Sequence, residues 1–387
     1  MKAAQRSRPT LGLAMIMEDE IKDLDRIVHD YGKFFDKVYV TVTDRQTYAT
    51  LRKRFPKKSE TDSLVQLSYF KWIDHFGKAR QYNQRQIKTD YWMWLDTDDE
   101  IEGVENVPQV IEYMVSNNLD AVWFQYDYVP RVNFSDPKAI LWRERIIRTD
   151  SGLEWKNKAV HETVNVHSGI RDESLEQIMI KHRKTAEQIP ASLTRNKFIL
   201  EKEWQRTRRA STAWYLGASL KQTGDYEGAI EKLLYATEHS KDWALKFLAL
   251  QNLCECYYQT GKYDAALAVA NKRGAMDPDH PGHWYQKFSI YKAMGDLDSA
   301  MQSAEIAMVK RVEGRRENIV GHDPTLYQYR GPFAVAQVYL STGNIERAYQ
   351  IYSEVKKTAP KYIEEQSTAA GIQWNTIFEQ AYSENVG

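Results

Sequence analysis

The stretch Trp92-Met93-Trp94-Leu95-Asp96-Thr97-Asp98-Asp99-Glu100 joins an apolar run to four carboxylates within five positions. Carboxylates this close repel one another, and burying them is costly unless a cation compensates their charge. Oxygen ligands of this kind suit Mg²⁺ or Mn²⁺. An acidic turn that opens a helix is the alternative interpretation, because Asp and Glu also favour helix N-termini. The stretch therefore predicts a buried strand whose carboxyl end binds a divalent metal.

The segments around this stretch alternate between strand-like and helix-like patterns. The predicted elements are strands at Leu11–Met17, Lys37–Val42, Tyr91–Leu95 and Ala121–Tyr126, and a helix from Ile21 to Tyr31. Such alternation predicts a layered α/β domain with a mostly parallel sheet. Because ligands of these sheets bind at the carboxyl ends of the strands, we expect the chemistry just after Met17, Val42 and Leu95.

The second part of the chain, from about Thr207, follows a different period. Four glycines in similar contexts are separated by 37, 34 and 48 residues, and each has an alanine five positions later: Gly224 and Ala229, Gly261 and Ala266, Gly295 and Ala300, Gly343 and Ala348. A glycine between two helices permits the backbone turn that ends the first helix. The alanine lets the second helix pack closely against the first. The longest spacing predicts an inserted loop near Val312–Thr325.

This pattern resembles the tetratricopeptide repeat, whose unit is about 34 residues long. The resemblance covers residues 204–365 and leaves 366–387 as a C-terminal helix or tail. An unrelated helical bundle is the alternative. Repeat arrays of this class bind extended partners or associate with one another. We therefore expect an all-α, tetratricopeptide-like repeat domain that holds a macromolecular partner or forms a homodimer.

The composition excludes several classes of protein. The 387 residues carry 53 basic and 53 acidic side chains, so no global field attracts nucleic acid or an acidic membrane. The two cysteines, Cys254 and Cys256, cannot build a disulfide framework and fit a reducing compartment. The apolar run Leu11–Met17 is too short for a membrane span and ends in acidic residues, unlike a signal peptide. We expect a cytoplasmic protein without a transmembrane segment.

Six blocks of the N-terminal half, taken in order, resemble family 2 glycosyltransferases with a GT-A fold. They are Met15–Glu20, Asp44, Trp72–Asn83, Asp96–Asp98, Arg143–Arg148 and Trp155–Glu162. Glu18, Asp19 and Gln81 depart from the residues usual in that family. The resemblance implies an α/β, Rossmann-like nucleotide-sugar domain over residues 1–203, followed by the repeat domain at 204–365. Several enzymes that resemble this family carry a tetratricopeptide array after the catalytic domain, as in this chain.

The resemblance also implies roles for single residues. The candidate metal ligands are Asp98, Asp96 and His161, and the candidate general base is Glu162, with Asp99 and Glu100 as rivals. The candidates for binding the nucleotide sugar are Asp19, Glu20, Asp44, Arg80, Asp96 and Lys156. Surface solvation is the alternative for Arg80 and Lys156, and a purely structural histidine is the alternative for His161.

Together these features predict transfer of a sugar from a nucleotide diphosphate donor, a UDP-sugar by resemblance, to a macromolecular acceptor, with protein or peptide as the first choice. The family implies an inverting displacement that uses Mn²⁺ or Mg²⁺. The alternatives are a cell-surface saccharide or lipid-linked acceptor, a modified base in DNA, and an inert repeat scaffold. A DNA acceptor would need a basic face, but the local clusters at Lys181–Lys184 and at Arg206, Arg208 and Arg209 are typical of solvated helix surface.

Overall fold

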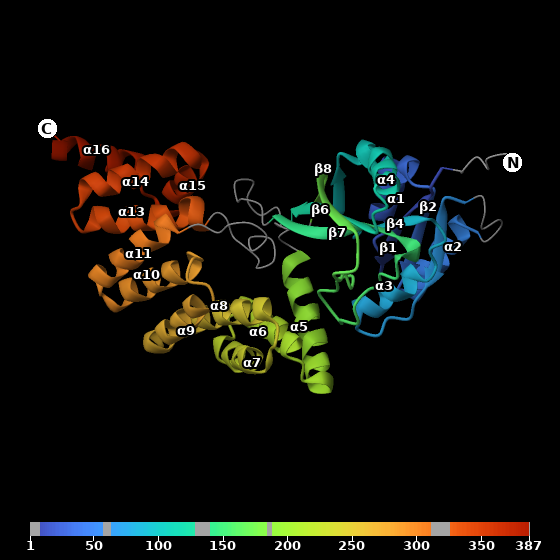
Figure 1. Ribbon diagram of the computed structural model, residues 1–387, viewed down its shortest axis with the longest axis horizontal. Coiled ribbons are helices and arrows are strands. Elements are labelled where there is room, and N and C mark those ends of the chain that lie inside the picture. Colours follow the sequence, from blue (N-terminus) through green and yellow to red (C-terminus); the bar gives the residue numbers. More distant parts are fainter. Residues whose placement is uncertain (1–7, 57–62, 128–139, 184–187, 311–325, 387) are drawn as a thin grey trace. The chain divides into compact units, whose positions relative to one another are not determined.

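The computed structural model describes residues 8–56, 63–127, 140–183, 188–310 and 326–386. The chain forms two compact units that divide between Leu200 and Glu201. The first unit contains a sheet with helices, and the described residues of the second are helical and connecting segments (Figure 1). The expected fold class, an α/β domain followed by an all-α repeat domain, is confirmed. The loop expected at Val312–Thr325 lies outside the described residues.

The sheet of the first unit has eight strands in the order β3-β2-β1-β4-β7-β6-β8-β5. The strands are β1 (Leu11–Met17), β2 (Lys37–Val42), β3 (Val65–Tyr69), β4 (Tyr91–Trp94), β5 (Asp99–Glu102), β6 (Ala121–Asp127), β7 (Ile140–Arg148) and β8 (Asp172–His182). The first four strands of this order are parallel to one another, as expected. The other half is mixed, because β7 pairs antiparallel with β4 and β6, β5 pairs antiparallel with β8, and β6 is parallel to β8.

The α-helices between the strands are α1 (Ile21–Tyr31), α2 (Arg45–Arg54), α3 (Phe76–Gln84) and α4 (Val107–Ser116) in the described part of the sheet domain. All seven residues of β1 are buried, which is the pattern of a parallel strand covered on both faces. The main core cluster joins side chains of β1, β2, β4 and β6 to Leu24 and Ile27 of α1 and Val110 and Met114 of α4. The carboxyl ends of the parallel strands are thus held by a rigid core.

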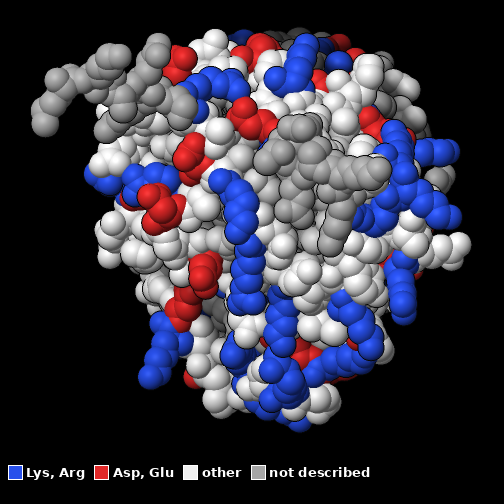
Figure 2. All heavy atoms as spheres, turned by 90° about the vertical axis from the view of Figure 1, so that its right-hand side faces the viewer, with Lys and Arg blue, Asp and Glu red and all other residues white. Residues whose placement is uncertain are grey.

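One face of the first unit carries many basic side chains (Figure 2), although the whole chain has no net charge. Lys and Arg side chains are prominent on the face that Figure 2 shows. On this side lies α2, whose last turn contains Arg52, Lys53 and Arg54 (Figure 1). The neutral total is therefore compatible with a locally basic surface (Figure 2).

The second unit is built from helix pairs. Its described helices are α6 (Ala210–Gln222), α7 (Tyr226–His239), α8 (Trp243–Gln259), α9 (Tyr263–Met276), α10 (Gly282–Met294), α11 (Leu297–Val309), α13 (Gly331–Ser341), α14 (Ile345–Thr358), α15 (Pro360–Ala370) and α16 (Trp374–Val386). A π-helical turn at Leu326–Arg330 precedes α13, and the boundary between the units falls inside α5 (Gln188–Thr207). None of the described helices is both long and apolar enough to cross a membrane.

The predicted turn glycines and packing alanines occupy the positions expected of a tetratricopeptide-like array. The four glycines have φ between 71° and 82°, the left-handed region that favours glycine. The four alanines, Ala229, Ala266, Ala300 and Ala348, are 0% exposed. Each alanine lies in the second helix of a pair, where a larger side chain would separate the two helices.

We therefore expect Ala266→Leu to lower the free energy of unfolding by about 1–3 kcal/mol, because it overpacks the contact between α8 and α9. The control is Ala268→Leu, which changes an exposed position of the same helix. Urea unfolding followed by circular dichroism measures both variants. Equal stability of the two would contradict the assigned packing role.

Candidate active site

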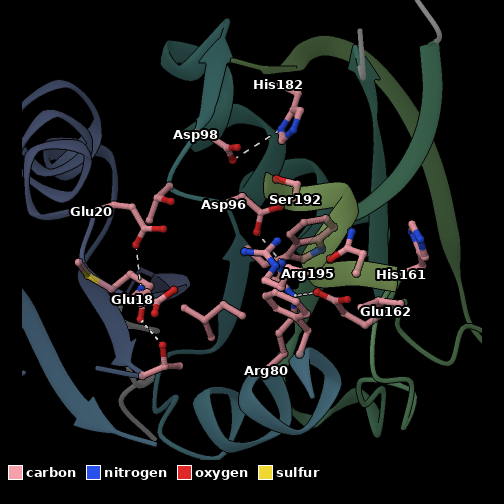
Figure 3. A pocket seen from close by; sticks show the side chains of 18 of the residues that line it. Glu18, Glu20, Arg80, Asp96, Asp98, His161, Glu162, His182, Ser192 and Arg195 are labelled. Atoms are coloured by element: carbon pink, nitrogen blue, oxygen red, sulfur yellow. Dashed lines mark hydrogen bonds and ion pairs between the residues drawn. The ribbon is translucent and has the colours of Figure 1, made fainter. Parts of the chain in front are cut away.

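Strand ends of the sheet, the loop that carries His161 and Glu162, and one face of α5 surround a cavity of about 550 Å³ (Figure 3). All its lining residues belong to the first unit. Its ionisable side chains are Glu18, Glu20, Arg80, Asp96, Asp98, Tyr126, Arg143, His161, Glu162, His182 and Arg195. Trp72, Phe76 and Trp94 add aromatic surface. This lining suits a charged ligand that also carries a planar ring.

Arg80 joins two of the carboxylates. It lies on α3 and is only 6% exposed. Its Nε donates to Glu162 Oε1 at 2.5 Å, and its Nη2 donates to Asp96 Oδ1 at 2.5 Å. The rings of Trp94 and Trp155 lie 5.0 and 4.8 Å from its guanidinium carbon. Burial alone would raise the pKa of Asp96, but the charge of Arg80 lowers it to about 2, so Asp96 is ionised at neutral pH.

Helix α3 is fixed to the sheet by a buried amide. Asn83 Nδ2 donates to Met15 O and Tyr39 O, each at 3.0 Å, and to Thr41 Oγ1 at 2.9 Å. These acceptors belong to β1 and β2. The helix that carries Arg80 is therefore held in register with the strands whose ends form the cavity.

The loop that carries His161 and Glu162 is tied to the first turn of α3. Phe76 N donates to Ala159 O at 2.8 Å, and Gly77 N donates to Lys158 O at 3.1 Å. A Cβ atom at position 77 would lie 2.5 Å from Lys158 O, so the approach requires glycine. The backbone oxygen of Glu162 also accepts from Arg143 Nη2 at 3.1 Å. The loop is thus positioned by both the helix and the sheet.

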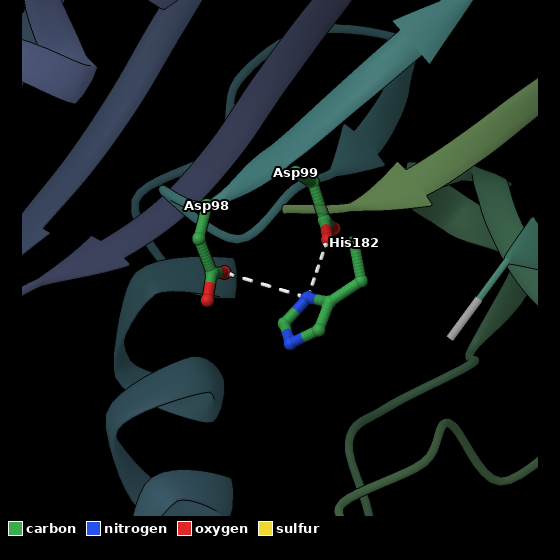
Figure 4. Close-up of side chains that lie close together, drawn as sticks. All are labelled: Asp98, Asp99 and His182. Carbon is green, nitrogen blue, oxygen red and sulfur yellow. Dashed lines mark hydrogen bonds and ion pairs between the residues drawn. The ribbon is translucent and has the colours of Figure 1, made fainter. Parts of the chain in front are cut away.

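Asp98, Asp99 and His182 offer ligand atoms that lie within 4.8 Å of one another (Figure 4). Asp99 is fully buried, and its Oδ2 pairs with Arg145 Nη1 at 3.3 Å. Its Oδ1 accepts from the Tyr126 hydroxyl at 3.0 Å and lies 3.1 Å from His182 Nδ1. Burial lowers the pKa of His182, but the hydrogen bond with Asp99 and the charge of Asp98 more than offset it and raise the pKa.

This group fits a divalent cation by its donor chemistry. Carboxylate oxygens and imidazole nitrogens are both common ligands of divalent metal ions. Asp98 and His182 line the cavity, and Asp96 does too. Both oxygens of Asp99 already have partners, so Asp99 is suited to orienting His182 rather than to binding the ion directly.

The structure brings part of the predicted set together. The cavity is lined by Glu20, Arg80, Asp96, Asp98, His161 and Glu162, and not by Asp19, Asp44, Asp99, Glu100 or Lys156. Asp44 caps α2 by accepting from Thr47 N at 2.6 Å, Glu100 pairs with Arg183, and Lys156 is exposed. The roles assigned to these residues stay predictions.

Several lining residues were given no role by the sequence analysis, among them His182, Ser192 and Arg195. His182 stands in the basic run that was interpreted as helix surface, and that interpretation is wrong. It ends strand β8 and is 8% exposed. The period-two pattern of Ile178, Ile180 and His182, all buried, is the signal that predicts a strand there. Ser192 and Arg195 lie on a helix with no local motif.

The family comparison agrees with this geometry. The model of "Glycosyl transferase family 2" matches residues 44–179, which contain Arg80, the carboxylates of residues 96–100 and Glu162. The first unit therefore carries a family 2 glycosyltransferase domain, and the protein is a glycosyltransferase. A comparison with curated proteins gave no match.

Comparison with solved structures found tetratricopeptide proteins. A crystal structure of MamA is 15% identical, covers 46% of this chain and 95% of its own, and has a TM-score of 0.37. A thermophilic TPR protein of Thermus thermophilus is 17% identical, with 48% and 93% covered and a TM-score of 0.36. A tetratricopeptide repeat protein from Parabacteroides merdae is 14% identical, with 51% and 73% covered and a TM-score of 0.36.

The contact between α3 and the Glu162 loop predicts that Gly77→Ala lowers the free energy of unfolding by about 1–3 kcal/mol, because the new methyl group meets backbone oxygen. The control is Gly169→Ala, where an added Cβ would lie 3.4 Å from His167, an easier contact with a side chain. Urea unfolding of both variants tests this. A Gly77→Ala protein as stable as the control would show that the loop moves away without cost.

The pKa of Asp96 gives a pH-dependent prediction for Arg80→Gln. In the unfolded chain Asp96 takes up its proton near the ordinary pKa of 3.8, and in the folded protein near 2. The stability that Arg80 gives through Asp96 is therefore present above about pH 4 and lost as the pH falls towards 2. We expect the difference in unfolding free energy between the native protein and Arg80→Gln to shrink over that range.

The measurement is urea unfolding of both proteins at a series of pH values, with Arg85→Gln as control. Arg85 is exposed at the end of α3 and does not line the cavity. A difference that stays constant from pH 5 to pH 2 would contradict the ion pair.

Proposed function

We propose that the N-terminal domain transfers a sugar from a nucleotide diphosphate donor to a macromolecular acceptor, with the help of a divalent metal. The observation that carries this proposal is the bridge by which Arg80 holds Asp96 and Glu162 at one cavity. A transferase must place a leaving group and an acceptor on either side of one sugar carbon. Asp96 and its acidic neighbour Asp98 suit the metal-bound diphosphate, and Glu162 suits the acceptor.

The metal site that we propose uses Asp98 and His182, with Asp96 beside them, and His161 as the competing ligand from the sequence. Mn²⁺ and Mg²⁺ are the candidate ions. A bound ion would neutralise the diphosphate and stabilise the charge that develops on the leaving group. The buried Asp99 would keep His182 in a ligating orientation.

Glu162 is our candidate general base. It takes the proton from an acceptor hydroxyl or thiol while that atom attacks the anomeric carbon, which gives inversion by a single displacement. Arg80 orients its carboxylate. The rivals are less suited, because Asp99 is buried against Arg145 and Glu100 is paired with Arg183.

We propose a UDP-sugar as the donor. Glu20 shapes the loop after β1, since its Oε2 accepts from Glu18 N at 2.8 Å and Asp19 N at 3.1 Å. This loop and Asp44, which follows β2, would lie against the nucleoside, and Lys156 is the candidate partner of a phosphate. The match to the family over residues 44–179 supports this arrangement without naming the nucleotide.

For the acceptor we propose a protein or peptide held by the repeat domain, which we place at residues 204–365 after a transferase domain at 1–203. Arrays of this kind bind extended chains or pair with a second copy, so a homodimer belongs to the proposal. Both cysteines are free and buried, which fits a reducing cytoplasm.

The proposal is tested by incubating the protein with a panel of UDP-, GDP- and other nucleotide sugars, with Mn²⁺ or with a chelator, and measuring release of the nucleoside diphosphate. We expect release from one donor class that stops with the chelator. Intact-mass analysis of candidate acceptor proteins then identifies the sugar and the acceptor. No release from any donor with either metal would overturn the proposal and leave an inert scaffold.

In the same assay we expect Asp98→Ala to lower turnover at least about a hundredfold, because metal stabilisation of the leaving group contributes several kcal/mol. The control is Glu112→Ala, which removes an exposed carboxylate of α4. Titration with Mn²⁺ accompanies the rates, since the variant should also need far more metal. Turnover near that of the control would remove Asp98 from the mechanism.

A further inference from the structure

One face of α5 forms part of the cavity wall. Ala191, Ser192, Arg195 and Asn196 all line the cavity, and their spacing places them on one side of a helix. Figure 3 draws Ser192 and Arg195 among the lining side chains, together with Asp96 and Asp98. These four residues follow the segment matched by the family model, which ends at residue 179.

Arg195 differs from the other two arginines of the lining. Arg80 is paired with Asp96 and Glu162, and Arg143 is paired with Glu144. Within the described part of the chain Arg195 makes no ion pair. Its guanidinium carbon lies 4.9 Å from the centre of the Phe76 ring, a cation–π contact that restrains the side chain but supplies no negative counter-charge. Arg195 is therefore the lining arginine whose charge is left for a ligand.

The charge of Arg195 acts on Glu18, at the side of the cavity that we propose for the donor. Burial and the neighbouring Glu20 and Asp19 raise the pKa of Glu18, and Arg195 opposes this rise. Glu18 follows β1 directly, in the loop that we propose for the nucleoside. Asn196, the residue after Arg195, also lines the cavity, and its buried Oδ1 lacks a hydrogen-bond partner among the described residues.

The chemistry of the departing group creates the need for such a cation. A nucleoside diphosphate carries about three negative charges at neutral pH, one more than a divalent ion neutralises. The charges of Arg80 and Arg143 are already compensated by carboxylates of the chain. An unpaired guanidinium offers several donors and remains protonated, so it suits phosphate oxygens well.

We propose that Arg195 binds the diphosphate of the donor and holds its charge as the sugar leaves, an inference that rests on the proposed function. In the transfer the bond from the anomeric carbon to the diphosphate oxygen breaks, and its electron pair goes to that oxygen. The new bond joins the anomeric carbon to the acceptor atom, whose proton passes to Glu162. Arg195 donates hydrogen bonds to the diphosphate throughout and exchanges no proton.

The experiment compares Arg195→Gln, Arg195→Lys and Arg195 in the native protein, with the donor that the native protein uses. The matched control is Lys197→Gln, which removes a cation of the same helix outside the cavity lining. Inhibition constants are measured for the nucleoside diphosphate and for the nucleoside alone, together with the rate of donor hydrolysis. Thermal melting checks that each variant is folded.

We expect Arg195→Gln to weaken binding of the nucleoside diphosphate about tenfold to a hundredfold, which is the effect of losing one charge-assisted interaction. Binding of the nucleoside alone should not change. Donor hydrolysis should slow as well, and Arg195→Lys should recover part of both losses. The control should match the native protein.

Three results would overturn the inference. Unchanged diphosphate binding in Arg195→Gln would remove Arg195 from the donor site. An equal loss of affinity for the nucleoside diphosphate and for the nucleoside would show that Arg195 has a structural role. Slower transfer to an acceptor with normal diphosphate binding would assign Arg195 to the acceptor. Each result requires a native protein that turns over a donor, so it is distinct from failure of the proposed function, in which no donor reacts.

Discussion

The ion pairs of Arg80 are the constraint on which the site depends. The buried guanidinium of Arg80 pairs with two carboxylates that are distant in the sequence. They are Asp96, in the turn after β4, and Glu162, in the loop that follows β7. Removing that charge would leave Asp96 and Glu162 close together without compensation, which is costly in a partly buried site. The two tryptophan rings and the anchored α3 keep the guanidinium in place. The carboxylates that we propose for the donor and for the acceptor are thus coupled through the side chain of Arg80.

Much of the fold follows from local sequence patterns. β1, β2 and the helix from Ile21 to Tyr31 have the bounds expected from continuous apolar runs and helical periodicity. The repeat glycines and alanines were also recognisable, because a left-handed turn and a close helix contact each restrict the residue type. β7 was not expected as a strand, since Arg143, Glu144 and Arg145 interrupt its apolar pattern. Arg145 is compensated by an ion pair with Asp99 and by the ring of Trp94, both distant in the sequence, and no local pattern reveals such partners.

The site was only partly predictable for a similar reason. Asp96, Asp98 and Glu162 stand out because their segments match family blocks, and all three line the cavity. Glu100 and Asp99 are equally acidic, yet the strand that begins at Asp99 turns them towards protein partners. His182 ends β8 and Arg195 lies on α5, and both reach the cavity only because the tertiary fold brings these two elements to it. Sequence spacing identifies the acidic motif but not the side chains that distant segments of the chain contribute to the cavity.

The pairing of β8 has an evolutionary consequence. Ile178, Ile180 and His182 point to the same side because side chains alternate along a strand. Inserting or deleting one residue between Ile178 and His182 would turn the imidazole away from Asp98 and Asp99, whereas a change of two residues would preserve its direction. Lineages of this domain should therefore change the spacing between Ile178 and His182 only in steps of two, while the irregular pairing between Ser174 and Met179 can absorb other changes of length.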